Sequence, residues 1–210
     1  MSVLVLIEHD NQNIKTSSLN TITAAKKINK SVHAIVLGEN CLKVADQVSK
    51  CEGIEEVFIA DNSIFKNHVA ENISPVILEL SDKYSHILAP SSTFGKNIMP
   101  RVAALLDVAQ ISDIISIEDN DTFVRPIYAG NANLKLQSTD NKKIITVRTT
   151  NFEATKINGG NAKITKIKKE EDPGLSKFVK NALNKSDRPE LTAADIIISG
   201  GRGMESGKNF

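Results

Sequence analysis

Short apolar runs alternate with amphipathic stretches along the first hundred residues of the chain. Val3–Ile7 is an unbroken run of Val, Leu and Ile, which is typical of a strand buried on both faces of a parallel sheet. The stretch from about Ser17 to Asn29 repeats apolar residues at helical spacing, with Ser17 or Ser18 placed to cap it. Three similar pairs follow, with strands expected at 32–37, 56–60 and 86–89 and helices at about 42–48, 66–81 and 97–106.

This alternation predicts an α/β fold, because strand–helix repeats with short connections are typical of doubly wound parallel sheets. We expect a Rossmann-like three-layer sandwich. The pattern changes after Gln110, where closely spaced strands are separated by turns rich in Asn, Asp and Gly. Such turns favour antiparallel strands added to the sheet. These strands are expected at 111–117, 122–129, 132–138 and 143–148.

Residues 153–173 have the composition of a connector, and Lys163–Lys169 alternates Lys with Ile or Thr. Two interpretations fit the lysines: a solvated edge strand protected from aggregation, which we favour, or a strip that binds anions. A short helix is expected over Leu175–Leu183, and Asp187–Leu191 is expected to be extended around its proline.

The last segment carries the sharpest candidate site. Asp195–Ser199 is an apolar run typical of a buried strand, and Gly200-Gly201-Arg202-Gly203 follows it directly. A glycine turn lets backbone N–H groups approach an anion, and an arginine adds a bidentate donor for phosphate. The glycine spacing differs from the dinucleotide-binding fingerprint, so a tight turn with an exposed arginine is the alternative. The candidate cofactor-binding residues are Gly201, Arg202 and Gly203.

Other polar segments have weaker functional interpretations. Ser91–Thr93 follow an expected strand, where ligands of open α/β sheets bind, but they also suit an ordinary helix cap. His9-Asp10 has the residue types of a proton donor and its orienting carboxylate, yet no nucleophile accompanies it, and a loop is the simpler interpretation. We expect no catalytic residues and no metal site, since the remaining histidines are scattered: His33, His68 and His86.

Composition excludes several classes of function. Lys and Arg total 26 and Asp and Glu total 25, so the net charge of +1 does not favour nucleic acid. The chain has no Trp, 7 Phe and 2 Tyr, which argues against base-stacking surfaces. Cys41 and Cys51 are too few for a disulfide scaffold. No apolar segment is long enough for membrane insertion and no signal peptide is evident, so a soluble, unexported protein is expected.

Several long segments together resemble the alpha subunit of electron transfer flavoproteins. The resemblance runs nearly from end to end, and its motifs are specific because they are long and uninterrupted. The segments that carry it are Val3–Asp10, Phe94–Asn97, Pro100–Ala104, Ile111–Ile115, Asp121–Ala132, Ser186–Thr192 and Ser199–Gly203.

The resemblance implies a division of the chain and a role for it. Residues 1–185 would form the N-terminal α/β domain, and 186–210 the linker and opening strand and turn of an FAD-binding α/β domain that is truncated here. Arg202 would contact FAD, with Gly201 and Gly203 in the same turn. The family carries electrons from acyl-CoA and related dehydrogenases through FAD to the electron transfer flavoprotein–ubiquinone oxidoreductase. It does so as a heterodimer with a beta subunit, as an electron carrier and not as an enzyme.

Since the residues that hold most of the flavin in this family lie beyond this turn, we expect the 210 residues alone not to retain FAD. The expected location is the bacterial cytoplasm, or the mitochondrial matrix for a processed eukaryotic chain. Two alternatives are a standalone adenine-nucleotide-binding module, which calorimetry with AMP or ATP would reveal, and a flavin-free docking or assembly protein.

Overall fold

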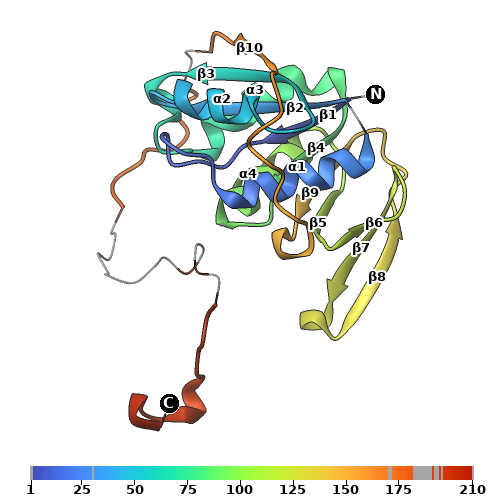
Figure 1. The fold of residues 1–210 in the computed structure, drawn as a ribbon, viewed down its shortest axis with the longest axis vertical. Helices are drawn as coiled ribbons and strands as arrows, with labels where there is room; N and C mark the ends of the chain where they lie inside the picture. The colour runs from blue at the N-terminus through green and yellow to red at the C-terminus, as the bar shows by residue number, and fades with distance from the viewer. Residues whose placement is uncertain are drawn as a thin grey trace. The chain divides into compact units, whose positions relative to one another are not determined.

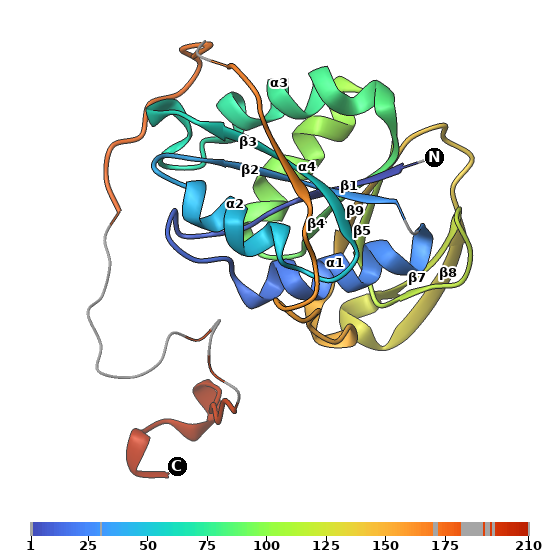
Figure 2. The same cartoon turned by 45° about the horizontal axis from the view of Figure 1, so that its top comes forward.

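The computed structural model describes residues 2–29, 31–169, 172–181, 191, 194 and 196–209. The chain divides into two compact units, Met1–Phe178 and Val179–Phe210. The first unit is a three-layer α/β sandwich around a parallel sheet (Figures 1 and 2). The expected α/β class with a mostly parallel sheet is therefore confirmed.

Within the described residues, the main sheet has seven strands in the order β10-β3-β2-β1-β4-β9-β5. Every neighbouring pair in it is parallel. The order reverses between β1 and β4, as in other doubly wound sheets. The strands are β1 (Ser2–Leu6), β2 (Val32–Gly38), β3 (Ile54–Asp61), β4 (Tyr84–Pro90), β5 (Gln110–Ile114), β9 (Lys143–Val147) and β10 (Lys163–Lys166).

The helices cover both faces of this sheet and divide the core into two clusters. Helices α1 (Thr16–Ile28) and α2 (Leu42–Ser49) pack on one face, and α3 (Ala70–Leu80) and α4 (Thr93–Leu105) pack on the other. Successive side chains of the central strand β1 point to opposite faces of the sheet, since Val3 and Val5 belong to one cluster and Leu4 and Leu6 to the other. This two-sided burial is the reason that β1 is apolar at every central position.

A second, antiparallel sheet packs against the first core cluster through Phe123 and Leu136. It consists of β6 (Ser116–Ile117), β7 (Thr122–Ile127) and β8 (Ala132–Gln137). The expected antiparallel strands are thus present, but they form a separate sheet, and the β7–β8 hairpin extends away from the main sheet (Figure 1).

The expectation that all strands after Gln110 are antiparallel is wrong for β5 and β9. Strand β9 lies between β4 and β5 and is parallel to both. Ile144, Ile145 and Val147 are fully buried, and Ile144 and Ile145 face opposite core clusters. A strand that is apolar on both faces buries its side chains only in the interior of a sheet covered on both faces, and β9 lies in such a position.

The helix caps follow the expectation in one case and not in the other. Ser92 is the N-cap of α4, and its Oγ accepts a hydrogen bond from the Gly95 N–H at 3.5 Å. The N-cap of α1 is Lys15, which makes no side-chain cap bond, so neither Ser17 nor Ser18 caps that helix. Both serine hydroxyls are instead directed to Glu8.

Strand β10 is at the edge of the main sheet and pairs only with β3 among the described strands. The favoured interpretation of the lysine-rich segment as an edge strand is therefore confirmed for Lys163–Lys166. The chain then runs through residues 172–181 without a helix, so the described part of the helix expected over Leu175–Leu183 is absent. Residues 182–183 and 187–190 of the expected elements lie outside the described residues.

The strand expected over Asp195–Ser199 is also absent from its described residues, 196–199, while Asp195 itself lies outside them. Ile196, Ile197 and Ile198 are exposed by 84%, 54% and 80%. No described strand pairs with this segment, and an apolar run forms a buried strand only when neighbouring strands satisfy its backbone groups and cover its side chains.

A close approach at the start of α4 generates a stability prediction. A Cβ added to Gly95 would lie 1.9 Å from the backbone oxygen of Pro90, at the end of β4. Gly95→Ala should therefore lower the free energy of unfolding by about 3 kcal/mol, because the helix must shift away from the strand. Urea unfolding measures this change.

The matched control is Asn97→Ala, at an exposed position of the same helix, which should leave stability within about 0.5 kcal/mol of the unmodified chain. Equal stability of Gly95→Ala and the unmodified chain would contradict the tight packing of α4 on β4.

Candidate functional site

The carboxyl ends of β1 and β4 mark the point where the strand order reverses, which is the usual ligand-binding edge of a doubly wound sheet. Two segments named in the sequence analysis meet here. His9-Asp10 follows β1, and Ser91–Thr93 connects β4 to α4. The structure thus brings the two weaker candidate segments together at one edge.

Glu8 joins the elements at this edge. Its side chain is buried, and its carboxylate accepts hydrogen bonds from the Ser17 hydroxyl at 3.0 Å and the Ser92 hydroxyl at 2.7 Å. The Lys15 ammonium pairs with the other carboxylate oxygen at 3.1 Å. The Ser18 hydroxyl bonds both the Glu8 N–H and the Glu8 carbonyl. The Glu8 carboxylate is thereby bonded by the protein's own side chains, and α1 and α4 are tied to β1.

His9 is held in one neutral tautomer. Its Nδ1 accepts a hydrogen bond from the Asn11 N–H at 3.0 Å, so Nε2 carries the proton and donates to the Leu37 carbonyl at 3.1 Å. Burial, aided by the nearby His68, lowers the pKa of His9 to about 3. Asp10 accepts from the Gln12 and Asn13 N–H groups of its own loop. Both residues therefore shape the loop, and the one N–H proton of neutral His9 is already bonded to the Leu37 carbonyl.

His68 is distant from His9 in the sequence, but it packs beside His9 in the structure. The two rings meet edge to face with centroids 4.8 Å apart, and Phe94 lies on the other side at 5.5 Å from the His68 ring. Burial lowers the pKa of His68 despite the nearby Glu8 carboxylate. Nothing in the residue spacing predicts this pair, because His68 reaches it through the loop between β3 and α3.

The other two histidines lie elsewhere in the first unit. His33 Nδ1 is 2.8 Å from the Tyr84 hydroxyl, and His86 Nε2 is 2.6 Å from the Asn120 carbonyl oxygen. Across the described residues, no three His, Cys, Asp or Glu side chains are grouped so that they would hold a metal ion.

An ion pair that the sequence analysis did not identify lies beside this edge, at the ends of β5 and β9. Arg148 donates from Nε and Nη2 to one carboxylate oxygen of Asp113, the Nε bond being 3.0 Å long. Burial alone would raise the pKa of Asp113, but the hydrogen bonds from Arg148, together with the charges of Arg148 and Lys96, lower it. Asp113 adopts a φ of 59°, a conformation that few residues other than glycine take. The pair holds the end of β5 against the residue that follows β9.

The Gly-Gly-Arg-Gly turn lies in the second unit, and there it begins a 3-10 turn, Arg202–Met204. The Met204 N–H donates to the Gly201 carbonyl at 3.0 Å, and the Glu205 N–H donates to the Arg202 carbonyl at 3.0 Å. Gly201, Arg202 and Gly203 are exposed, and a Cβ at either glycine would meet no atom within 4 Å. Residues 200–202 and 204–207 line a shallow cavity of about 250 Å³.

Hydropathy adds one finding about the described residues: none of their helices combines the length and the apolar character needed to span a bilayer.

The buried histidines generate a prediction about pH. The pKa of each of three histidines is lower in the folded chain than the ordinary value of 6.5: His9, His68 and His86. The unfolded chain therefore binds more protons below about pH 6.5, and stability that is fully present above that pH is lost as the pH falls toward 3. Each such histidine contributes a slope of up to about 1.4 kcal/mol per pH unit.

Urea unfolding between pH 7.5 and 4.5 measures how steeply the free energy of unfolding depends on pH. His9→Gln should reduce this slope by about the amount that one buried histidine contributes. A slope that is unchanged in His9→Gln would show that His9 is not buried in its neutral form.

Comparisons with known proteins agree with the fold. Residues 3–172 match the family model described as "Electron transfer flavoprotein domain". The electron transfer flavoprotein subunit alpha of Pseudomonas aeruginosa is 50% identical over 210 residues, covering 100% of this chain and 68% of that protein. The mitochondrial alpha subunit of Dictyostelium discoideum is 44% identical over 223 residues, covering 99% of this chain and 63% of that protein.

The alpha subunit of Bradyrhizobium diazoefficiens is 45% identical and is covered over 67% of its length. The chain thus spans about two thirds of the length of these relatives. From this match across nearly all of its residues, the chain belongs to the electron transfer flavoprotein family and is similar to its alpha subunits.

Proposed function

We propose that this chain acts as the N-terminal part of an electron transfer flavoprotein alpha subunit that forms a heterodimer with a beta subunit. The observation that carries the proposal is the 50% identity to the Pseudomonas aeruginosa alpha subunit over the whole chain, a span that includes the Gly-Gly-Arg-Gly turn. In the parallel α/β unit the buried Glu8 carboxylate at the strand ends is bonded by Lys15, Ser17 and Ser92, which supports a role as a scaffold more than a role as a ligand-binding module.

The heterodimer would accept electrons from acyl-CoA and related dehydrogenases and pass them to a membrane quinone oxidoreductase. FAD, when bound, supplies the redox chemistry by taking up and releasing these electrons. The protein would position the flavin and its partners without acting on a substrate, so the chain is proposed as part of an electron carrier and not of an enzyme. The proposed location is the bacterial cytoplasm, or the mitochondrial matrix for a eukaryotic chain.

The turn in the second unit has donors that suit a phosphate of FAD. The Arg202 guanidinium is exposed, and a guanidinium matches two phosphate oxygens at once. Gly201 and Gly203 leave open space beside their Cα atoms, which lets an anion approach the backbone N–H groups. Arg202, Gly201 and Gly203 would therefore hold the pyrophosphate when FAD is bound.

The same turn encloses too little volume to hold a whole flavin dinucleotide. Its cavity of about 250 Å³ is smaller than the sites that enclose drug-sized ligands, roughly 300–1,000 Å³. The 210-residue chain purified alone should therefore show no flavin absorbance near 450 nm after dialysis. A stoichiometric flavin band would contradict this part of the proposal.

Co-production with the beta subunit of the same organism tests the proposed assembly. The chain should elute with the beta subunit as a one-to-one complex in size-exclusion chromatography. If the folded chain elutes alone while the beta subunit remains separate, the proposed heterodimer is wrong, whatever the flavin content of either protein.

Arg202→Gln tests the proposed role of the turn in the natural flavin-containing alpha–beta complex. Loss of a charged, bidentate donor should weaken FAD binding by about tenfold or more, since hydrogen bonds to charged groups contribute about 1.5–3 kcal/mol. Fluorescence titration of the flavin-free complex with FAD measures the affinity. Lys208→Gln, which removes an exposed cation from the next turn, is the matched control and should change it by less than about threefold. Equal affinity of the Arg202→Gln and Lys208→Gln variants would contradict the assignment of Arg202.

A further inference from the structure

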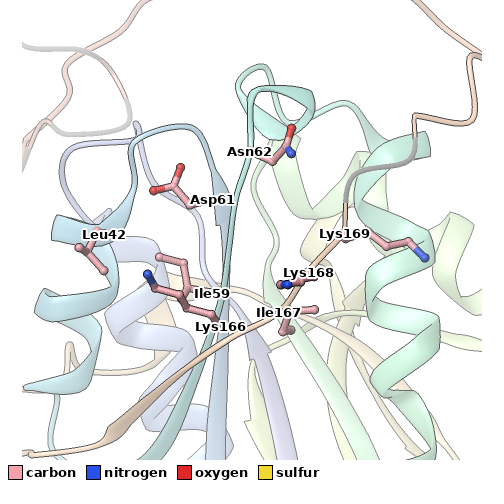
Figure 3. Close-up of a pocket in the computed structure, with 8 residues that line it drawn as sticks. All are labelled: Leu42, Ile59, Asp61, Asn62, Lys166, Ile167, Lys168 and Lys169. Carbon is pink, nitrogen blue, oxygen red and sulfur yellow. The ribbon is translucent and has the colours of Figure 1, made fainter.

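A groove at the carboxyl ends of β3 and β10 has no part in the proposed flavin role (Figure 3). Its volume is about 260 Å³, which is enough for a small organic molecule. Leu42, Ile59 and Ile167 supply its apolar lining. Ile59 is buried, whereas the Leu42 side chain at the start of α2 is 53% exposed and has room to contact a ligand.

Three lysines border the groove, and they differ in whether a carboxylate pairs with them: Lys166, Lys168 and Lys169. Lys169 reaches Glu79 of α3, with an Nζ–Oε2 distance of 3.3 Å, so its charge is matched. Lys166 extends toward Leu42, whereas the Lys168 ammonium lies beside Ile167 (Figure 3). Within the part of the chain that the structure describes, no carboxylate forms an ion pair with Lys166 or Lys168. Two unmatched ammonium groups therefore lie beside an apolar surface.

A single carboxylate on the rim limits the charge that the groove accepts. Asp61 at the end of β3 accepts the Asn40 N–H at 2.6 Å, and its carboxylate lies beside the groove. The two unmatched lysines and this carboxylate together leave a local excess of one positive charge. A ligand with one negative charge balances the groove, whereas a second negative charge would be repelled by Asp61.

We propose that this groove binds a small organic monoanion. The anionic group would lie near the Lys166 and Lys168 ammonium groups, and the apolar body would contact Leu42 and Ile59. Apolar lining with a few convergent polar groups is the general character of small-molecule sites. The site lies at the carboxyl ends of parallel strands, where ligands of α/β sheets bind. The proposal does not rest on the flavin role, and it extends the alternative interpretation of the lysine-rich segment as an anion-binding strip.

Benzoate is a suitable probe because it combines a carboxylate with a small apolar ring. In methyl NMR spectra of the full 210-residue chain, benzoate should shift the signals of Leu42, Ile59 and Ile167. Benzyl alcohol, which has the ring without the charge, and inorganic phosphate, which has charge without the ring, should each bind at least about fivefold more weakly, because each lacks one of the two contacts. Benzyl alcohol binding as tightly as benzoate, or shifts confined to other methyl groups, would overturn the proposal.

Variants of the rim test the charge assignment. Lys166→Gln and Lys168→Gln should each weaken benzoate binding by about threefold, and Asp61→Asn should strengthen it by a similar factor. The matched control is Lys163→Gln, at the other end of the same strand, which should leave binding unchanged. All four positions are exposed, so the variants should fold, and unchanged methyl spectra without ligand verify this. Equal affinity of the Lys166→Gln/Lys168→Gln double variant and the Lys163→Gln control would overturn the proposal.

Discussion

The burial of β1 on both faces is the constraint on which the rest of the first unit depends. Val3, Leu4, Val5 and Leu6 are fully buried, and consecutive residues belong to opposite core clusters. Such a strand is stable only with helices above and below it and a strand along each edge. The positions of α1 and α2 on one face, of α3 and α4 on the other, and of β2 and β4 at its edges all satisfy this one requirement.

The same constraint explains the polar edge of the sheet. Where β1 ends, the chain leaves the apolar interior and Glu8 is the first polar side chain, still buried. A buried carboxylate is costly unless its oxygens are hydrogen-bonded, and Lys15, Ser17 and Ser92 supply these partners. The crevice that other doubly wound proteins use for a ligand is therefore used here to fasten α1 and α4 to the sheet. This internal use of the edge is consistent with a scaffold whose proposed cofactor contacts lie in a different unit.

Sequence patterns predicted the elements best where one periodicity was unambiguous. The first four strands and helices were expected from apolar runs and helical spacing, and each is present within a few residues of its expected bounds. The direction of β9 was missed, although the adjacent isoleucines at 144 and 145 had the pattern of a doubly buried strand. The run at Ile196–Ile198 has the same pattern, yet it is exposed. An apolar pattern indicates that a segment could form a buried strand, but it does not show whether neighbouring strands are present to pair with it and cover it.

The sequence by itself determined the α/β class, the edge character of β10 and the family resemblance, because these depend on the order and spacing of residues along the chain. Only the tertiary structure decided which side chains meet. It brought His9 beside His68, and it joined Asp113 to Arg148 over a separation of 35 residues. It also turned Ser17 from an expected helix cap into a partner of Glu8. These contacts depend on strand order and loop path, and hydrophobic periodicity carries no information about either.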